Sequence, residues 1–323
     1  MRDDDLLRRL AGAGRLGYGA ANVGNLHRAL SDDDARAVLD AAWEAGVRHY
    51  DTAPHYGLGL SERRLGEFLR TKPRDEFLVS TKVGRLLVPH PAGAGADDLA
   101  NGFAVRADWR RVWDASGAGV RRSLEESLGR LGLDAVDIVY LHDPERYDLD
   151  RALGDGLPAL AALRQAGLVR AVGVGSMDRE ALTRAARSGL VDLLMVAGRH
   201  TLADPGAGDD VLPACREHGV RVVAAAVYNS GLTARSTPPD DARFDYGPAP
   251  AALLARVRRI AEVCAAHGVD LPVAATQYPL RADVVDAVVI GGARPDQVRA
   301  NAVRLATPVP QALWDDLARA GLA

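Results

Sequence analysis

The sequence predicts a (β/α)8 barrel, in which eight parallel strands close into a ring and helices connect them. Strand-like runs alternate with helical ones over nearly all of the 323 residues, which is typical of parallel strands joined by helical crossovers. The apolar runs are short and partly continuous, as strands buried on both faces require. The length also suits one α/β barrel, so we expect a single domain over residues 1–323.

Eight mostly apolar runs qualify as the barrel strands, and polar or Gly-containing segments bound each of them. In chain order they are Leu16 to Gly19, Val47 to Asp51, Phe77 to Lys82, Val136 to His142, Val169 to Gly175, Leu193 to Ala197, Val220 to Ala226 and Val285 to Ile290.

Helical stretches with capping signals lie between these strands. Ser31 precedes DDDARAVLDAAWEAG, whose acidic first turn suits the positive end of the helix dipole and whose Gly46 supplies a stop. By the same reasoning, Ser61 opens the helix SERRLGEFLR and Gly268 closes the helix that ends in AAHG.

Two connections are too long to be simple turns, namely Val83 to about Gly117 and Asn229 to about Pro250. Connections of that length are usually lids or binding loops, with a disordered insertion as the alternative. The first holds Asp114 and three aromatic residues, and these aromatics, Phe103, Trp109 and Trp113, are candidates for a substrate wall.

Composition narrows the possible partners and the location of the protein. The net charge is −3 and Asp, Glu and Arg are interspersed, so no basic stripe is available for nucleic acid. Cys215 and Cys264 are too few for a disulfide framework and lack the spacing of a metal or redox motif. The first residues lack the apolar core of a signal peptide and no run is long enough to span a bilayer, so we expect a cytoplasmic protein without membrane contact. No helix stands out as an unburied dimer face, so a monomer or weak homo-oligomer is expected.

Four chemically complementary side chains fall at or just past the ends of strands. Tyr56 could transfer a proton near neutral pH only if its ordinary pKa of about 10 were lowered, and a neighbouring ammonium does that. Lys82 ends an apolar strand, where an unpaired ammonium is costly, and Asp51 is its natural counter-ion. We therefore expect Asp51 and Lys82 to pair and to hold the ammonium beside the phenol.

His142, the fourth of these residues, closes the run VDIVYLH. From there its ring could orient a substrate oxygen and share the transferred proton. Singly, the tyrosine could serve packing and the histidine a turn hydrogen bond. Because all four lie at strand ends, where such a barrel has its active site, catalysis is the favoured interpretation.

The segments DTAPHYGLGLSERRLG, STKVG, LHDP, VGVGS and VIGGARPDQVRAN, in this order and spacing, resemble the aldo-keto reductase superfamily. GNLHR, LHDPERYD, VAGRHTL and VYNSG further resemble its aldose and L-fucose dehydrogenase branch. The resemblance implies a (β/α)8 barrel that binds a nicotinamide dinucleotide without a Rossmann domain. It also implies that Tyr56 is the acid/base residue, that Lys82 and Asp51 tune it, and that His142 orients the reacting oxygen.

One motif points elsewhere. Gly12, Gly14 and Gly17 spell GxGxxG, as in a Rossmann fingerprint. However, LLRRLA before the motif is not strand-like and GYGAANVG after it does not open a helix. We expect a turn into the first strand instead.

The resemblance also implies cofactor-binding residues. Gly19 would lie under the nicotinamide, Ser176 would bond the nicotinamide amide, and Asn301 would contact the adenine. Tyr228, in VYNSG, is a further candidate. Two departures weaken this part of the resemblance, because Gly175 precedes Ser176 in place of the usual Ser-Asn pair, and Ala197 stands where Gln is common.

The choice between NAD and NADP depends on the segment after the eighth strand. Gly291 and Gly292 lead to a helix start at Pro295, which suits the adenosine phosphates. NADPH-using relatives carry a Lys and an Arg where this chain has Gly291 and Gln297. Two charge-assisted bonds of about 1.5 to 3 kcal/mol each are thereby lost, which favours NAD unless Arg294 compensates. NADP, or use of both cofactors, is the alternative.

The resemblance implies that the reaction is oxidation of an aldose of the L-fucose or D-threo type at C1, which yields the aldonolactone. His55, Asp114 and Arg199 lie near the predicted barrel mouth and could bond sugar hydroxyls, although rim residues are often simply solvated. The rival enzymatic hypotheses are an NADPH-dependent reductase of small aldehydes and a dehydrogenase of another alcohol, such as pyridoxal. A non-catalytic, nicotinamide-binding regulatory barrel is the hypothesis of another class, and nothing in binding alone requires a tuned phenol.

Overall fold

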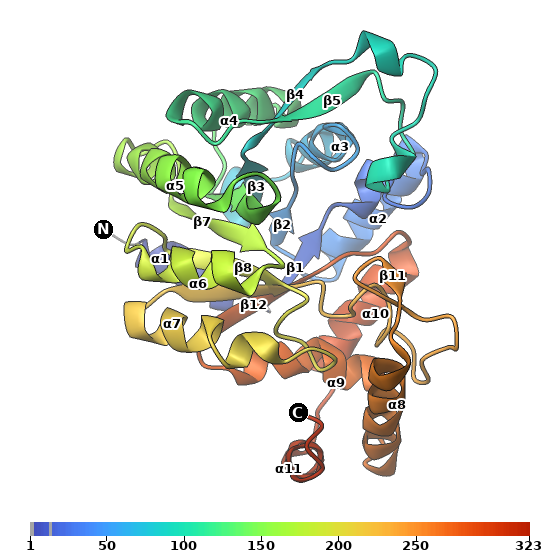
Figure 1. Cartoon of the computed structure of the whole chain (residues 1–323). Helices are drawn as coiled ribbons and strands as arrows, with labels where there is room; N and C mark the ends of the chain where they lie inside the picture. The colour runs from blue at the N-terminus through green and yellow to red at the C-terminus, as the bar shows by residue number, and fades with distance from the viewer. Residues whose placement is uncertain (1–2, 13–14) are drawn as a thin grey trace.

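The computed structural model of the chain describes residues 3–12 and 15–323, and it is a closed barrel of eight parallel strands (Figure 1). The strands neighbour one another in the order β1, β12, β9, β8, β7, β6, β3 and β2. Every predicted strand is present, and each boundary lies within two residues of the predicted one. Their bounds are β1 Leu16–Gly19, β2 His49–Asp51, β3 Leu78–Val83, β6 Ile138–His142, β7 Ala171–Ser176, β8 Leu193–Ala197, β9 Arg221–Ala225 and β12 Val285–Ile290.

Helices surround the barrel and cover the outer faces of its strands (Figure 1). Four helices differ. Helix α1 presents Leu6 and Leu10 to Leu78, Ile138 and Leu193 at the strand starts, so it packs at the N-terminal end of the barrel. Helices α8, α9 and α11 pack together in a second apolar cluster, whose described residues include none from the barrel strands. The helices are α1 Asp4–Gly12, α2 Asp32–Glu44, α3 Leu60–Leu69, α4 Gly117–Leu131, α5 Leu149–Gln165, α6 Arg179–Arg187, α7 Val211–His218, α8 Ala251–Ala266, α9 Leu271–Gln277, α10 Pro295–Ala306 and α11 Gln311–Arg319.

Three of the four predicted helix boundary signals are confirmed. The Ser31 side chain accepts the Asp34 N–H at the start of α2, and Gly46 and Gly268 follow α2 and α8 with positive φ angles. The prediction for Ser61 is wrong, because α3 begins at Leu60 and Ser61 lies inside the helix. Its buried hydroxyl donates instead to the Ala20 carbonyl at 2.8 Å, so it ties α3 to the end of β1.

The glycine motif of the N-terminal segment does not form a nucleotide-binding turn. Gly14 lies outside the described residues, Gly12 is the last residue of α1, and Gly17 belongs to β1. A Cβ atom at Gly17 would lie 2.9 Å from His49 Nδ1 on the neighbouring strand. Close packing inside the barrel therefore accounts for this glycine.

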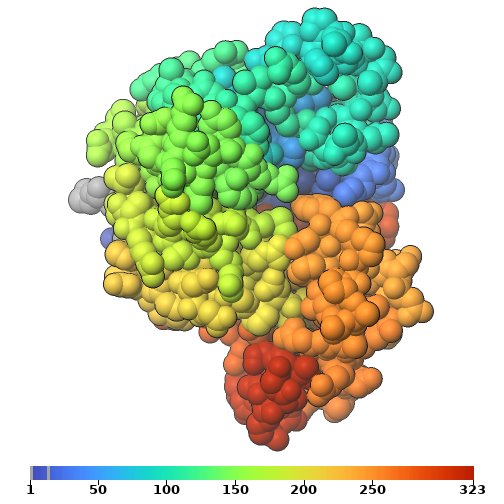
Figure 2. Space-filling view, in the orientation of Figure 1, coloured from blue at the N-terminus to red at the C-terminus, as the bar shows by residue number. Residues whose placement is uncertain are grey.

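Both long connections carry short antiparallel hairpins, so the disordered alternative is wrong. The first contains β4 Arg85–Pro89 and β5 Trp109–Trp113, and the second contains β10 Arg243–Phe244 and β11 Gly247–Pro248. In Figure 2 the first segment, in cyan, and the second, in orange, stand on either side of a strip where blue N-terminal residues are visible. No helix of the described residues is long and apolar enough to cross a membrane.

Helices α3 and α4 approach so closely at Gly66 that a Cβ atom there would overlap the backbone of Leu131. We therefore expect Gly66→Ala to lower the free energy of unfolding by about 1 to 3 kcal/mol, because the two backbones would have to separate. Gly154→Ala is the matched control, since Gly154 lies in α5 with open space at its Cβ position and alanine favours helices. Denaturant unfolding measures both variants, and equal stability of the two would contradict the close approach.

Candidate active site

Lys82 lies at the centre of a buried cluster at the C-terminal ends of β2 and β3. Its Nζ donates to Asp51 Oδ2 at 2.5 Å, to the Thr52 carbonyl at 3.0 Å and to the Tyr56 hydroxyl at 3.0 Å. Only 2% of Lys82 is exposed, and Asp51 is equally buried. The predicted ion pair beside the phenol is therefore present, and all three ammonium protons have acceptors.

The pKa of the Tyr56 phenol differs from the predicted one. Burial raises the pKa of Tyr56 to about 12, although the Lys82 ammonium acts to lower it. The prediction of a net lowered pKa is therefore wrong for this arrangement, in which burial outweighs the ammonium. Burial acts to lower the pKa of Lys82 itself, but Asp51 and Tyr56 together raise it, so the side chain stays charged.

Two residues that the sequence analysis missed extend the cluster into the barrel interior. Ser80 Oγ donates to Asp51 Oδ1 at 2.8 Å, and His49 Nε2 lies 3.3 Å from Ser80 Oγ. Both carboxylate oxygens of Asp51 are thus bonded. Burial lowers the pKa of His49 to about 4, so its ring is neutral at physiological pH. Strand alternation could have found them, since His49 precedes Asp51 by two residues and Ser80 precedes Lys82 by two.

Two histidine rings flank the phenol. The His142 ring lies edge-on to Tyr56 with centroids 5.9 Å apart, and the His55 ring lies 5.7 Å from that of His142. Burial and then the nearby Arg85 lower the pKa of both rings, to about 2 for His55 and well below the ordinary value for His142. Both are therefore neutral near pH 7, and His142 can act as a neutral hydrogen-bonding group.

The β4–β5 hairpin brings an aromatic wall to the cluster. The Arg85 guanidinium lies 4.4 Å from the Trp113 ring centroid and pairs with Asp143, which follows His142. Trp113 stacks on Tyr147 with ring centroids 6.1 Å apart and 14° between the planes. This places the predicted substrate residue Trp113 on the same side as His142.

The loop between β4 and β5 also reaches the cluster. Phe103 lies edge-on to His55 at 5.3 Å and 6.1 Å from Tyr56, and Arg111 joins Asp98 to the His55 carbonyl. Trp109, by contrast, is 46% exposed at the far end of the hairpin, so it is not part of this wall.

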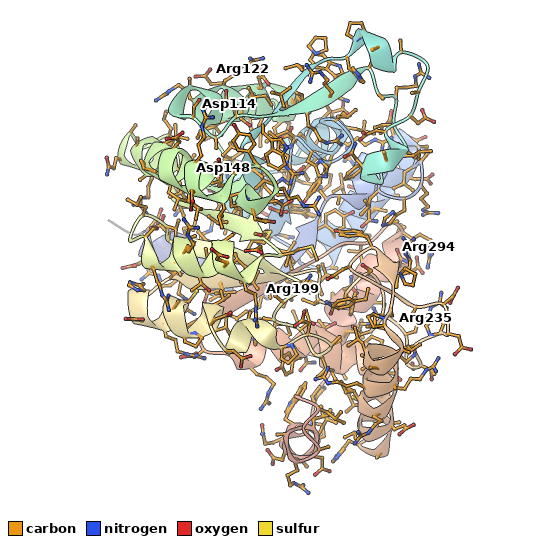
Figure 3. The ribbon with its side chains drawn as sticks, in the orientation of Figure 1. Asp114, Arg122, Asp148, Arg199, Arg235 and Arg294 are labelled. Carbon is orange, nitrogen blue, oxygen red and sulfur yellow. The ribbon has the colours of Figure 1, made fainter. Side chains whose placement is uncertain are left out.

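Two of the three polar candidates for sugar binding are already committed to structural contacts. Asp114 Oδ1 accepts the N–H and the hydroxyl of Ser116 at the start of α4. Arg199 donates to the Met177 carbonyl and pairs with Asp204 and Asp245 (Figure 3 labels Asp114 and Arg199). Only His55 of the three lies among the clustered rings.

Three glycines lie together where β1 and β12 end. A Cβ atom at Gly19 would lie 3.6 Å from the Gly291 nitrogen, and one at Gly291 would lie 3.3 Å from the Gly19 carbonyl oxygen. The Gly292 carbonyl accepts the Tyr18 hydroxyl at 2.8 Å, and α10 begins three residues later at Pro295. A backbone surface without side chains, next to a helix start, fits the phosphates of a dinucleotide.

Three polar side chains expected to bind the cofactor have protein partners, whereas a fourth, Asn22, borders the glycine surface, since its Oδ1 would lie 2.6 Å from a Cβ atom at Gly291. The Ser176 hydroxyl donates to Glu145 at 2.8 Å, and the Tyr228 hydroxyl donates to Asn301 at 2.9 Å. Asn301 is 4% exposed, and its Nδ2 is 3.5 Å from the Gly291 carbonyl. A cofactor amide at Ser176 would have to replace the contact with Glu145.

Two arginines lie at the start of α10, and one of them, Arg28, donates to the Ala293 carbonyl at 2.9 Å. Arg294 pairs with Asp296 through two contacts of 3.0 Å, and both side chains are exposed (Figure 3 labels Arg294). Gln297 Oε1 accepts the Ala293 N–H at 2.9 Å. Asp296 therefore offsets the charge of Arg294, the residue named above as able to compensate for the missing lysine and arginine.

Comparison with known proteins agrees with this geometry. The Aldo/keto reductase family model matches residues 15–320. The chain is 57% identical over 308 residues to D-threo-aldose 1-dehydrogenase from a Pseudomonas species, which covers 95% of this chain and 94% of that protein.

A less similar relative and a solved structure are consistent with the same family. Pyridoxal 4-dehydrogenase from Microbacterium luteolum is 36% identical over 322 residues, covering 95% of this chain and 94% of that protein. An aldo-keto reductase from Bacillus halodurans, solved in its holo form, superposes with a TM-score of 0.74 at 25% identity, covering 96% of this chain and 92% of that one.

Proposed function

The chain belongs to the aldo/keto reductase family and is an oxidoreductase, and we propose that it oxidises an aldose of the D-threo or L-fucose type at C1 to the aldonolactone. The observation that carries the proposal is the buried Lys82 ammonium between Asp51 and Tyr56. This arrangement suits a tyrosine that acts as the base for a hydroxyl proton. The similarity to D-threo-aldose 1-dehydrogenase supports the substrate class.

Tyr56 is the proposed acid/base residue. It accepts the proton of the C1 hydroxyl as a phenolate, the form that burial disfavours and the Lys82 ammonium favours, while the hydride leaves C1. The Lys82 ammonium, 3.0 Å from the phenol oxygen, stabilises the phenolate, and Asp51 keeps that ammonium charged and in place. Ser80 fixes the second oxygen of Asp51, so the carboxylate cannot rotate away from Lys82 without losing a hydrogen bond.

His142 is the proposed orienting residue. Its neutral ring stands edge-on to the phenol, where an N–H can bond the reacting oxygen and hold it near Tyr56. Because its pKa is well below the ordinary value, the ring is a weak base and competes little with a phenolate at Tyr56 for the proton. His55 and Trp113 are the proposed substrate-contacting residues on the adjoining wall, where a ring face can cover the sugar.

A nicotinamide dinucleotide is the proposed cofactor, and when bound it supplies the hydride acceptor. The bare backbone of the three glycines and the start of α10 support this proposal. We prefer NAD to NADP because Arg294 is paired with Asp296 and position 297 is uncharged. The residues proposed to hold the cofactor are Gly19, Ser176, Tyr228, Gly291, Gly292, Arg294, Gln297 and Asn301.

We further propose that the protein acts in the cytoplasm, as a monomer or weak homo-oligomer and without nucleic acid or membrane partners. Both cysteines are buried free thiols, which suits a reducing compartment. The net charge of −3 and the interspersed charges support the absence of a nucleic-acid surface.

The proposal predicts that purified protein reduces NAD when it is offered L-fucose, D-arabinose or L-galactose. Absorbance of the reduced nicotinamide measures the rate, with NADP tested in parallel. Turnover of pyridoxal alone, or reduction of small aldehydes by NADPH with no sugar oxidation, would contradict the aldose proposal and favour a rival enzyme.

Tyr56→Phe is the matched variant for that assay, since it removes one hydroxyl and keeps the ring contacts with Phe103 and His142. We expect turnover to fall by about 10²- to 10⁴-fold, the usual effect of losing an acid/base group, while the dissociation constant for the cofactor stays the same. Full turnover in this variant would exclude Tyr56 from the chemistry. Cofactor binding without turnover in either protein would favour the regulatory barrel.

The cofactor preference makes a separate prediction. Gln297→Arg adds a cation at the start of α10, and one charge-assisted bond to a 2′-phosphate is worth about 1.5 to 3 kcal/mol. We expect the ratio of kcat/KM for NADP to that for NAD to rise about 10- to 100-fold. Gln311→Arg on α11 adds the same charge elsewhere and should leave the ratio unchanged. A parent enzyme that already prefers NADP, or a ratio that Gln297→Arg does not move, would contradict the proposal.

A further inference from the structure

A cavity of 740 Å³ lies outside the barrel mouth, between α3, α4 and the β4–β5 hairpin. None of the four residues of the proposed catalytic cluster lines it. The hairpin lies beside both helices in Figure 1, and Figure 3 labels one of its lining residues, Arg122, on α4. The cavity is therefore a separate feature that the proposed reaction does not use.

Guanidinium groups form one side of this cavity. A Cβ atom at Gly59 would lie 3.1 Å from Arg130 Nε and 3.2 Å from Arg63 Nη1, so two cations border the same point. Arg130 is balanced by Glu62 at 2.5 Å. Arg63 has no carboxylate within 4.0 Å among the described residues, and burial and then Arg130 lower its pKa.

Arg70 adds a second unbalanced cation to the same side. It lies two helical turns beyond Arg63 in the sequence of α3, lines the cavity, and forms no ion pair with any residue that the structure describes. Glu67 also lines the cavity from α3, and it too makes no ion pair within the described chain, whereas Glu126 is paired with Arg122 at 2.7 Å. Four arginines and two glutamates thus face the cavity, and two of the arginines lack a partner.

Apolar groups form the opposite side. Leu87, Pro89 and Trp109 line the cavity from the hairpin, where Pro89 and Trp109 are register partners. Trp109 is 46% exposed, so part of its indole remains accessible beside the cavity. The cavity thus combines an aromatic and aliphatic surface with a net positive charge, because among the described residues the unpaired Arg63 and Arg70 outnumber the unpaired Glu67.

We propose that this cavity binds a small organic anion, with its phosphate or carboxylate at Arg63 and Arg70 and its apolar body against Trp109 and Leu87. Guanidinium groups bind such anions through paired hydrogen bonds, and an accessible indole can pack against a flat apolar body. The volume of 740 Å³ is within the range of small-molecule sites. The proposal is independent of the reaction, since binding requires no turnover.

Calorimetric titration of the full chain with phenyl phosphate tests the site, with inorganic phosphate as the reference that lacks an apolar body. We expect saturable binding of one phenyl phosphate, tighter than that of inorganic phosphate and unaffected by saturating NAD. Arg63→Gln and Trp109→Ala should each weaken binding at least tenfold. Arg121→Gln is the matched control, because Arg121 is exposed on α4 next to a lining residue but does not line the cavity.

Three results would overturn the proposal. The first is absence of saturable binding, and the second is equal weakening by Arg63→Gln and Arg121→Gln. The third is displacement of phenyl phosphate by NAD, which would assign the binding to the barrel mouth. A short oligoglutamate is titrated in the same way, and tighter binding of that peptide than of phenyl phosphate would show that the cavity accepts an acidic protein segment instead.

Discussion

The buried ion pair between Lys82 and Asp51 is the interaction on which the rest of the site depends. Removing two ions from water is costly, and their attraction repays the cost only when the remaining protons and lone pairs are also bonded. Here the Thr52 carbonyl and the Tyr56 hydroxyl accept the remaining hydrogen bonds of the Lys82 ammonium, and the Ser80 hydroxyl donates to the second oxygen of the Asp51 carboxylate. Because β2 and β3 are neighbours in the barrel, the strand ends that carry the pair meet without any special loop.

The loops above the barrel repeat this arrangement at the rim, where buried arginines are paired with aspartates. Arg85 pairs with Asp143 and Arg111 with Asp98, and each pair fixes one part of the first long connection. Burial, and then Arg85, lower the pKa of His55 and of His142, and Arg111 also acts on His55, so both histidines stay neutral beside the phenol. The site therefore concentrates positive charge in fixed groups, where it can stabilise a phenolate or a developing oxyanion.

Sequence reasoning found what strand periodicity and strand ends encode, and missed what depends on depth of burial. The eight strands were predictable because their apolar runs are separated by polar, Gly-containing segments, and the Lys82 and Asp51 pair followed from the cost of a lone buried ammonium. Ser61 was misjudged because a tertiary bond to Ala20 uses the hydroxyl that a helix cap would need. The pKa of Tyr56 was misjudged because the sequence gives the ammonium but not the burial that outweighs it.

The proposed role of the ion pair requires that Lys82 lowers the pKa of Tyr56 while burial raises it. Titration of the tyrosinate absorbance tests this effect of Lys82 most directly. The spectrum of a Tyr56→Phe variant, subtracted at each pH, isolates Tyr56 from the other tyrosines. The comparison variant carries Asp51→Asn and Lys82→Met together, which leaves no unpaired charge in the barrel. Because Lys82 acts on the phenol more strongly than Asp51 does, ionisation of Tyr56 should move to higher pH in this variant. Ionisation at the same or a lower pH would contradict the role given to the ion pair.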